Sequence, residues 1–135
     1  MPSQEVINDN VDYVLPDKVS ILIVEDDEDI CSLFDYILSN AGYSVESVDD
    51  SFKALEKIRE NEFHIAILDY MLPEMRGNQL AEEIKKIRPN MKIVFVTGFP
   101  EFADKINNRR GALSQYALKK PVTQETLLQT IKMIE

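Results

Sequence analysis

The feature that most constrains the fold of this chain is an alternation of short apolar runs with segments whose apolar residues have helical spacing. Three runs, VSILIV (19–24), HIAILD (64–69) and KIVFVT (92–97), consist almost entirely of apolar residues. Such runs are typical of strands that are buried on both faces of a sheet. The segments between them carry apolar residues every three or four positions, as on one face of a helix. Strands that alternate with helices predict a parallel sheet with helices on both faces.

A strand followed by a helix is expected five times between residue 19 and the end of the sequence. The expected strands are 19–24, 43–48, 64–69, 92–97 and 116–120. The expected helices carry apolar faces formed by Ile30, Leu33, Phe34, Ile37 and Leu38; by Ala54, Leu55 and Ile58; by Leu80, Ile84 and Ile87; and by Leu127, Leu128, Ile131 and Ile134. A fourth, weakly apolar helix is expected from Pro100 to near Gly111. Gly42 should end the first helix, while Ser51 and Thr123 should cap the second and the last.

The 135 residues leave room for a single domain, which we place at 19–135. Residues 1–18 are polar and acidic, with no basic residue before Lys18, and are expected to form a flexible tail. An alternative for its apolar fragment VDYVL (11–15) is docking on the domain. The sequence stops at the last expected helix, so no output domain is expected to follow.

The charge and the cysteine content limit the possible partners and the compartment. The chain has 15 basic and 24 acidic residues and a net charge of −9, so it should repel nucleic acid and anionic membranes. A single cysteine, Cys31, excludes an internal disulfide and fits a reducing compartment. Neither a signal peptide nor a membrane-spanning apolar run is visible. We therefore expect a cytoplasmic protein.

Polar side chains lie at the carboxyl ends of four of the expected strands. These are Glu25 and Asp26, then Asp69, Thr97 and Lys120. In open parallel sheets, ligands bind beyond this edge. Converging carboxylates need a cation or a proton, and carboxylate oxygens suit Mg²⁺. Lys and Thr can bind phosphate oxygens, so Asp69 is placed like a nucleophile for phosphoryl transfer.

The motifs at this edge resemble those of the receiver domain of two-component response regulators, the CheY-like family. The likeness covers residues 19–135 and rests on Glu25 with Asp26, LDYMLPEMRG (68–77), VTG (96–98) and KKP (119–121). It implies a doubly wound, flavodoxin-like (βα)5 fold with strand order 2-1-3-4-5. It also implies that Asp69 accepts a phosphoryl group from a histidine kinase or a phosphotransfer protein. The first functional hypothesis is therefore a phosphoacceptor that signals by contact with another protein.

The resemblance also implies the roles of the other residues. It places Mg²⁺ on Asp26, Asp69 and the backbone carbonyl of Met71, with Glu25 helping through water. It assigns Thr97 and Lys120 to the phosphoryl oxygens and implies a cis peptide bond between Lys120 and Pro121. Asp27, Glu28 and Asp29 are instead expected to favour the positive N-terminus of the next helix. Catalysis should be limited to the domain's own phosphorylation and slow dephosphorylation.

The chain departs from the family pattern at two places. Ala117 stands where these receivers usually carry an aromatic residue that links the site to the output face. The adjacent Tyr116 does not replace it, because neighbouring residues of a strand point to opposite faces. Met71 and Phe99 stand where polar residues are common, and neither holds water strongly. We therefore expect slow loss of the phosphoryl group.

Two other functions are compatible with parts of the sequence. The missing aromatic residue suggests an interaction module with a receiver fold whose phosphorylation is unused. A flavodoxin-like cofactor binder would need a phosphate-binding loop after the first strand, and EDDED (25–29) would repel phosphate. The intact acids, Thr97 and Lys120 favour the phosphoacceptor.

Overall fold

The computed structural model describes residues 18–108 and 115–135. Its five strands are β1 (Ser20–Val24), β2 (Ser44–Val48), β3 (Ile65–Asp69), β4 (Lys92–Thr97) and β5 (Gln115–Lys119). They form one parallel sheet in the order β2-β1-β3-β4-β5, which confirms the predicted fold class. Residues 1–17 of the expected tail, with the VDYVL fragment, lie outside the described residues. The helix expected to end near Gly111 ends earlier, at Asn107.

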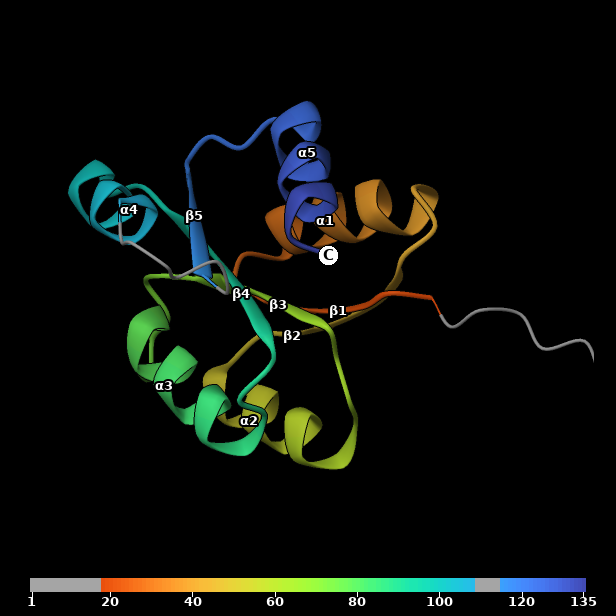
Figure 1. Ribbon diagram of the computed structural model, residues 1–135, viewed down its shortest axis with the longest axis vertical. Helices are drawn as coiled ribbons and strands as arrows, with labels where there is room; N and C mark the ends of the chain where they lie inside the picture. Colours follow the sequence, from red (N-terminus) through yellow and green to blue (C-terminus); the bar gives the residue numbers. More distant parts are fainter. Residues whose placement is uncertain (1–17, 109–114) are drawn as a thin grey trace, which may run out of the picture.

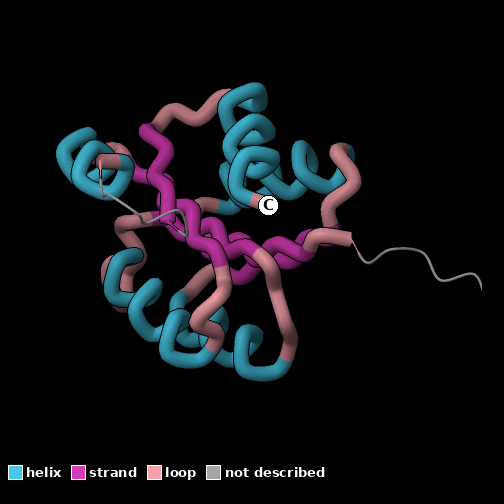
Figure 2. The backbone as a smooth tube through the Cα atoms, viewed as in Figure 1, coloured by secondary structure: helices cyan, strands magenta, loops and turns pink. Residues whose placement is uncertain are grey.

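Helices cover both faces of the sheet (Figure 1). They are α1 (Glu28–Asn40), α2 (Ser51–Glu60), α3 (Gly77–Ile87), α4 (Pro100–Asn107) and α5 (Gln124–Ile134). Helices α1 and α5 lie on one face and α2 and α3 on the other, while α4 lies beside the edge strand β5. Figure 2 shows the strands as a twisted middle layer between the two groups of helices. No helix of the described part is long and apolar enough to cross a membrane.

Each face of the sheet builds its own apolar cluster. Ile21, Ile23, Ile65 and Ile67 pack with side chains of α1 and α5. Their neighbours in sequence, among them Leu22 and Leu68, pack with α2, α3 and part of α4. Successive strand residues point to opposite faces, so a strand covered on both sides needs an unbroken apolar run. This is why the central strands could be recognised in the sequence.

The helix boundaries confirm most of the expected signals and correct two details. Gly42 adopts φ +100° after α1, and the Thr123 hydroxyl accepts a hydrogen bond from Thr126 N. The cap of α2 is Asp50 and not Ser51, since Ser51 is buried and bonds to the Glu74 carboxylate instead. Leu33 is 51% exposed because the buried stripe of α1 is centred on Phe34, Ile37 and Leu38.

Candidate functional site

Three carboxylates meet at the carboxyl edge of the sheet. Strands β1 and β3 are neighbours in register, with Val24 opposite Leu68, so the residues that follow, Glu25 and Asp69, lie side by side. Carboxylate oxygens of Glu25, Asp26 and Asp69 all lie within 4.8 Å of one another. Glu25 and Asp69 are buried, whereas Asp26 is exposed to solvent. The arrangement brings together the acids that the sequence singled out.

The surroundings of this cluster change the pKa of Glu25. Burial raises the pKa of Glu25 from 4.5 to about 7, and the charge of Asp69 and a hydrogen bond to it act in the same direction. The backbone N–H of Asp27, which donates to Glu25 Oε2 at 3.1 Å, and the positive charge of Lys120 oppose this rise only in part. In the absence of a cation, a proton on Glu25 relieves the repulsion.

Lys120 and Thr97 complete this edge of the sheet. The Lys120 ammonium lies 3.4 Å from Asp69 Oδ1, and the Lys120 backbone N–H donates to the Thr97 carbonyl at 2.7 Å. The peptide bond between Lys120 and Pro121 is cis, as predicted. Thr97 is buried at the end of β4, and its Oγ1 accepts a hydrogen bond from Phe99 N at 2.9 Å.

The loop after Asp69 is held close to the site. Met71 N donates to Asp69 Oδ1 at 3.3 Å, and Arg76 Nη1 donates to the Met71 sulfur at 2.9 Å. Gly77 is required where the loop returns, because a Cβ atom there would lie 2.7 Å from the Asp69 carbonyl oxygen. The Met71 side chain is 43% exposed and that of Phe99 48% exposed. Both side chains therefore face solvent.

The remaining acids of the EDDED segment serve α1, as expected. The Asp27 side chain accepts hydrogen bonds from Asp29 N and Ile30 N and forms the N-cap. Glu28 and Asp29 lie in the first turn, where negative charge is favourable.

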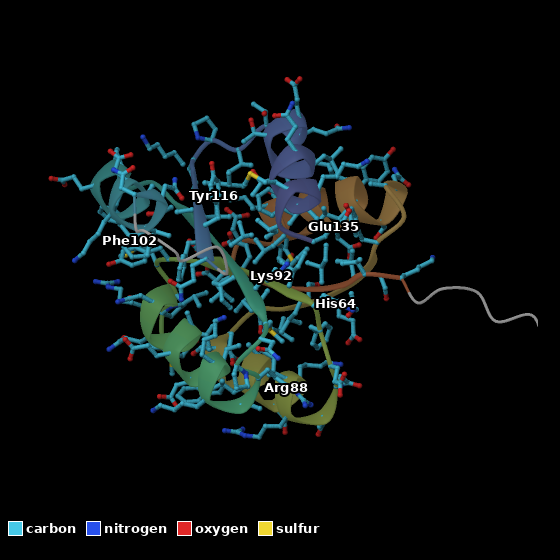
Figure 3. The ribbon with its side chains drawn as sticks, viewed as in Figure 1. His64, Arg88, Lys92, Phe102, Tyr116 and Glu135 are labelled. Atoms are coloured by element: carbon cyan, nitrogen blue, oxygen red, sulfur yellow. The ribbon has the colours of Figure 1, made fainter. Side chains whose placement is uncertain are left out.

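Ala117 and Tyr116 point to opposite faces of the sheet, as predicted, although β5 begins and ends one residue before the expected strand. Sequence reasoning missed two aromatic residues near this position, Tyr70 and Phe102. Ala117 belongs to the apolar cluster on the α3 and α4 side, and Tyr116 packs with the cluster on the opposite face. Figure 3 labels Tyr116 on β5 and Phe102 on α4. The Phe102 ring packs against the cluster that contains Ala117 and stacks on Tyr70. The signal available in the sequence was an aromatic residue directly after Asp69.

The set of donors fits a hard divalent cation. All three clustered side chains offer oxygen atoms, two of them are buried, and an ammonium group borders them. Mg²⁺ binds through one or two carboxylates, keeps several waters and shares its remaining positions with phosphate. The exposure of Asp26 leaves room for such waters.

Comparison with known proteins identifies the family of this chain. The family model described as "Response regulator receiver domain" matches residues 21–132. The chain belongs to the response regulator receiver domain family. It is thus the receiver domain of a two-component response regulator, and the fold and the order of the strands agree with that family.

Individual relatives support the same assignment. The response regulator receiver protein CpdR of Brucella abortus is 39% identical over 83 residues, which are 62% of this chain and 69% of CpdR. A CheY-like receiver domain from Methanospirillum hungatei superposes with a TM-score of 0.75 at 33% identity, over 87% of this chain and 93% of its own. The chemotaxis protein CheY4 of Vibrio cholerae superposes with a TM-score of 0.77 at 28% identity, over 88% and 100%. The chain spans about a quarter of the length of several transcriptional regulatory proteins that it also matches.

Proposed function

We propose that this receiver accepts a phosphoryl group on Asp69 from a histidine kinase or a histidine phosphotransfer protein in the cytoplasm, and that it then signals by contact with another protein. The supporting observation is the cluster of Glu25, Asp26 and Asp69 with the Lys120 ammonium 3.4 Å from Asp69 Oδ1. Buried carboxylates that lie this close are costly for a fold that does not use them. Family membership gives the cluster its chemical context.

In the proposed reaction, a carboxylate oxygen of Asp69 attacks the phosphorus of a phosphohistidine. The new O–P bond forms as the P–N bond breaks, and the imidazole leaves with the electron pair and takes up a proton. Lys120 stabilises negative charge on the phosphoryl oxygens, and the Thr97 hydroxyl donates a hydrogen bond to one of them. Asp26, Asp69 and the Met71 backbone carbonyl are the proposed ligands of Mg²⁺, with Glu25 acting through a bound water. When bound, this ion offsets charge on the transferred group.

The experiment is phosphorylation of the full chain by acetyl phosphate with Mg²⁺, followed by intact mass. Wild type should gain the mass of one phosphoryl group, and Asp69→Asn should gain none. Wild type without Mg²⁺ is the matched control and should remain unmodified. Equal labelling of Asp69→Asn would place the modification elsewhere and refute the proposal.

One observation favours the second candidate, an interaction module that does not use phosphorylation. Ala117 puts no aromatic ring at the β5 position, so the family's usual link from site to surface is missing. The same mass measurement separates the two candidates, because the module would gain no phosphoryl group. The buried acids and Lys120 favour the phosphoacceptor.

A further inference from the structure

Tyr70 is the residue next to the proposed phosphoacceptor, and hydrogen bonds hold its backbone on both sides. It follows Asp69 directly at the end of β3. Its backbone N–H donates to the Val96 carbonyl at 3.0 Å, and its carbonyl accepts from Gly77 N at 2.7 Å. With the peptide held on both sides, the position of the Tyr70 ring is tied to that of Asp69.

The Tyr70 ring belongs to an aromatic cluster formed by Tyr70, Phe95, Phe99 and Phe102. It stacks on Phe102, with ring centroids 4.0 Å apart and planes inclined at 27°. It meets Phe99 edge to face at 5.8 Å, and Phe102 in turn meets Phe95 edge to face at 5.2 Å. Such pairs have preferred geometries, so displacement of one ring is felt by its neighbours.

Two members of the aromatic cluster lie on the segment that follows Thr97. Phe99 donates its backbone N–H to the Thr97 hydroxyl oxygen, and Phe102 lies in the first turn of α4. A phosphoryl group on Asp69 would place new charge and new acceptor oxygens beside Thr97. Movement of this segment towards those oxygens would push Phe99 against Tyr70 and alter the stack with Phe102.

The far end of α4 is attached to β5 at Ala117. The Asn107 side chain donates to the Ala117 carbonyl at 2.9 Å and accepts from Ala117 N at 2.8 Å. An ion pair between Asp104 and Lys119 at 3.0 Å also joins the two elements, but both side chains are exposed and such pairs contribute little. The position of α4 thus depends on the aromatic cluster at one end and on Asn107 at the other.

Space is available for the Phe102 ring to change position. A cavity of about 460 Å³ lies beside it, lined by Tyr70, Phe95 and Phe102 and by polar residues of α3 and α4. In a close-packed interior a ring is held by its neighbours, whereas a ring beside a cavity has alternatives. The small side chain of Ala117 in the same apolar cluster adds no further barrier.

We propose that Tyr70 and Phe102 are positioning residues that couple phosphorylation of Asp69 to the position of α4 against β5. This inference rests on the proposed function and adds the route by which the site acts on its surroundings. Coupling between two places is reciprocal. The Tyr70–Phe102 stack therefore also sets how tightly the site holds a phosphoryl group.

The test follows backbone amide shifts of the full chain on addition of Mg²⁺ and beryllofluoride, a stable mimic of the phosphoryl group. In wild type, amides near Asp69 and those of Asn107 and Ala117 should all shift. In Phe102→Leu, which keeps an apolar side chain but loses the stack, the shift at Asn107 should fall by more than half. The affinity for the mimic should change as well. Phe102→Tyr keeps the ring and should restore both readouts.

Phe52→Leu is the matched control, because Phe52 is an exposed phenylalanine on α2. It should leave both readouts at their wild-type values. Tyr70→Leu removes the other half of the stack and should reproduce the Phe102→Leu result, which keeps the test decisive if one variant fails to fold. A wild-type shift at Asn107 that persists in both leucine variants would overturn the coupling.

The design separates the two proposals. Wild type that binds the mimic at Asp69 but shows no shift at Asn107 overturns the coupling alone. Wild type that binds no mimic overturns the proposed function, and the coupling falls with it.

Discussion

Polar side chains have different partners at the amino and carboxyl edges of the sheet. At the amino edge, three polar side chains bond to neutral backbone groups. His64 Nδ1 accepts from Ser20 N at 3.0 Å, and Arg88 Nε donates to the Ile58 carbonyl at 3.2 Å. The Lys92 ammonium donates to the Ile134 carbonyl. Figure 3 labels His64, Arg88 and Lys92. At the carboxyl edge, three carboxylates cluster together, and the Lys120 ammonium lies 3.4 Å from one of them, that of Asp69.

The two edges differ in whether like charges lie close together in the folded protein. The hydrogen bonds at the amino edge stabilise the protein, and the groups that form them need no ligand. At the carboxyl edge, Glu25 and Asp69 are buried next to each other. Their mutual repulsion is relieved when a proton or a cation binds there. The amino edge should therefore respond to mutation in stability, and the carboxyl edge in binding and chemistry.

The largest effect is expected for Asp26→Ala, which removes one acid from the cluster. Mg²⁺ affinity should fall by at least about tenfold, and phosphorylation by acetyl phosphate should slow with it. The free energy of unfolding without metal should stay the same or rise, because a repelling charge is gone. Mg²⁺ titration and denaturant unfolding measure the two. Asp29→Ala, an exposed acid outside the cluster, is the control; wild-type Mg²⁺ affinity in Asp26→Ala would refute the ligand assignment.

A smaller change, several-fold in rate, is expected at the exposed side chains of Met71 and Phe99. Hydrolysis of the aspartyl phosphate needs a water held in line with the phosphorus, and neither side chain binds water strongly. The double variant Met71→Asn with Phe99→Glu should therefore lose the phosphoryl group faster than wild type. Decay of label after removal of the donor measures the rate, with Phe52→Glu as a control. Equal decay in wild type and the double variant would contradict this role.

The raised pKa of Glu25 predicts a modest pH dependence of stability. Its pKa moves from 4.5 to about 7 on folding, chiefly through burial. The folded state therefore binds the proton more tightly, so this stabilisation is complete below pH 4.5 and is lost as the pH rises through 7. Metal-free wild type should melt a few degrees higher at pH 6 than at pH 8. Glu25→Gln carries no charge at either pH and should lose this part of the difference. An unchanged difference in Glu25→Gln would show that Glu25 is not the group responsible.

The smallest effect is expected at the amino edge. His64→Ala removes the acceptor for Ser20 N at an exposed position, so the free energy of unfolding should fall by about 1 kcal/mol or less. Phosphorylation and Mg²⁺ affinity should remain at wild-type values. Denaturant unfolding and the mass assay check both. A loss of phosphorylation would show that the two edges are not independent in the way the comparison states.

Much of the fold and of the site was predictable because both depend on local patterns. The apolar runs at 19–24, 64–69 and 92–97 mark strands that are covered on two sides. Once those strands are parallel neighbours, the residues after them must meet at one edge. That is why Glu25, Asp26 and Asp69 could be grouped before their distances were known.

Two local details were not decided by pattern alone. Asp50 and Ser51 are adjacent and both are good capping residues, and the buried bond from Ser51 to Glu74 decides between them. Leu33 fits the helical spacing of its neighbours, but it lies outside the buried face of α1 and is exposed. Helical spacing defines an apolar face and does not say where its edges are covered.

The sequence by itself determined the order of strands and helices, the edge at which the acids gather and the absence of an aromatic side chain at Ala117. Only the tertiary structure decided what packs near that position. Phe102 comes from a helix with a weak apolar pattern and reaches Tyr70 from 32 positions further along the chain. Contacts between side chains so far apart in sequence depend on how α4 lies against β5, and that follows from packing and from the bonds of Asn107 to Ala117. The raised pKa of Glu25 has the same origin, because burial is a property of the folded chain and not of any segment of it.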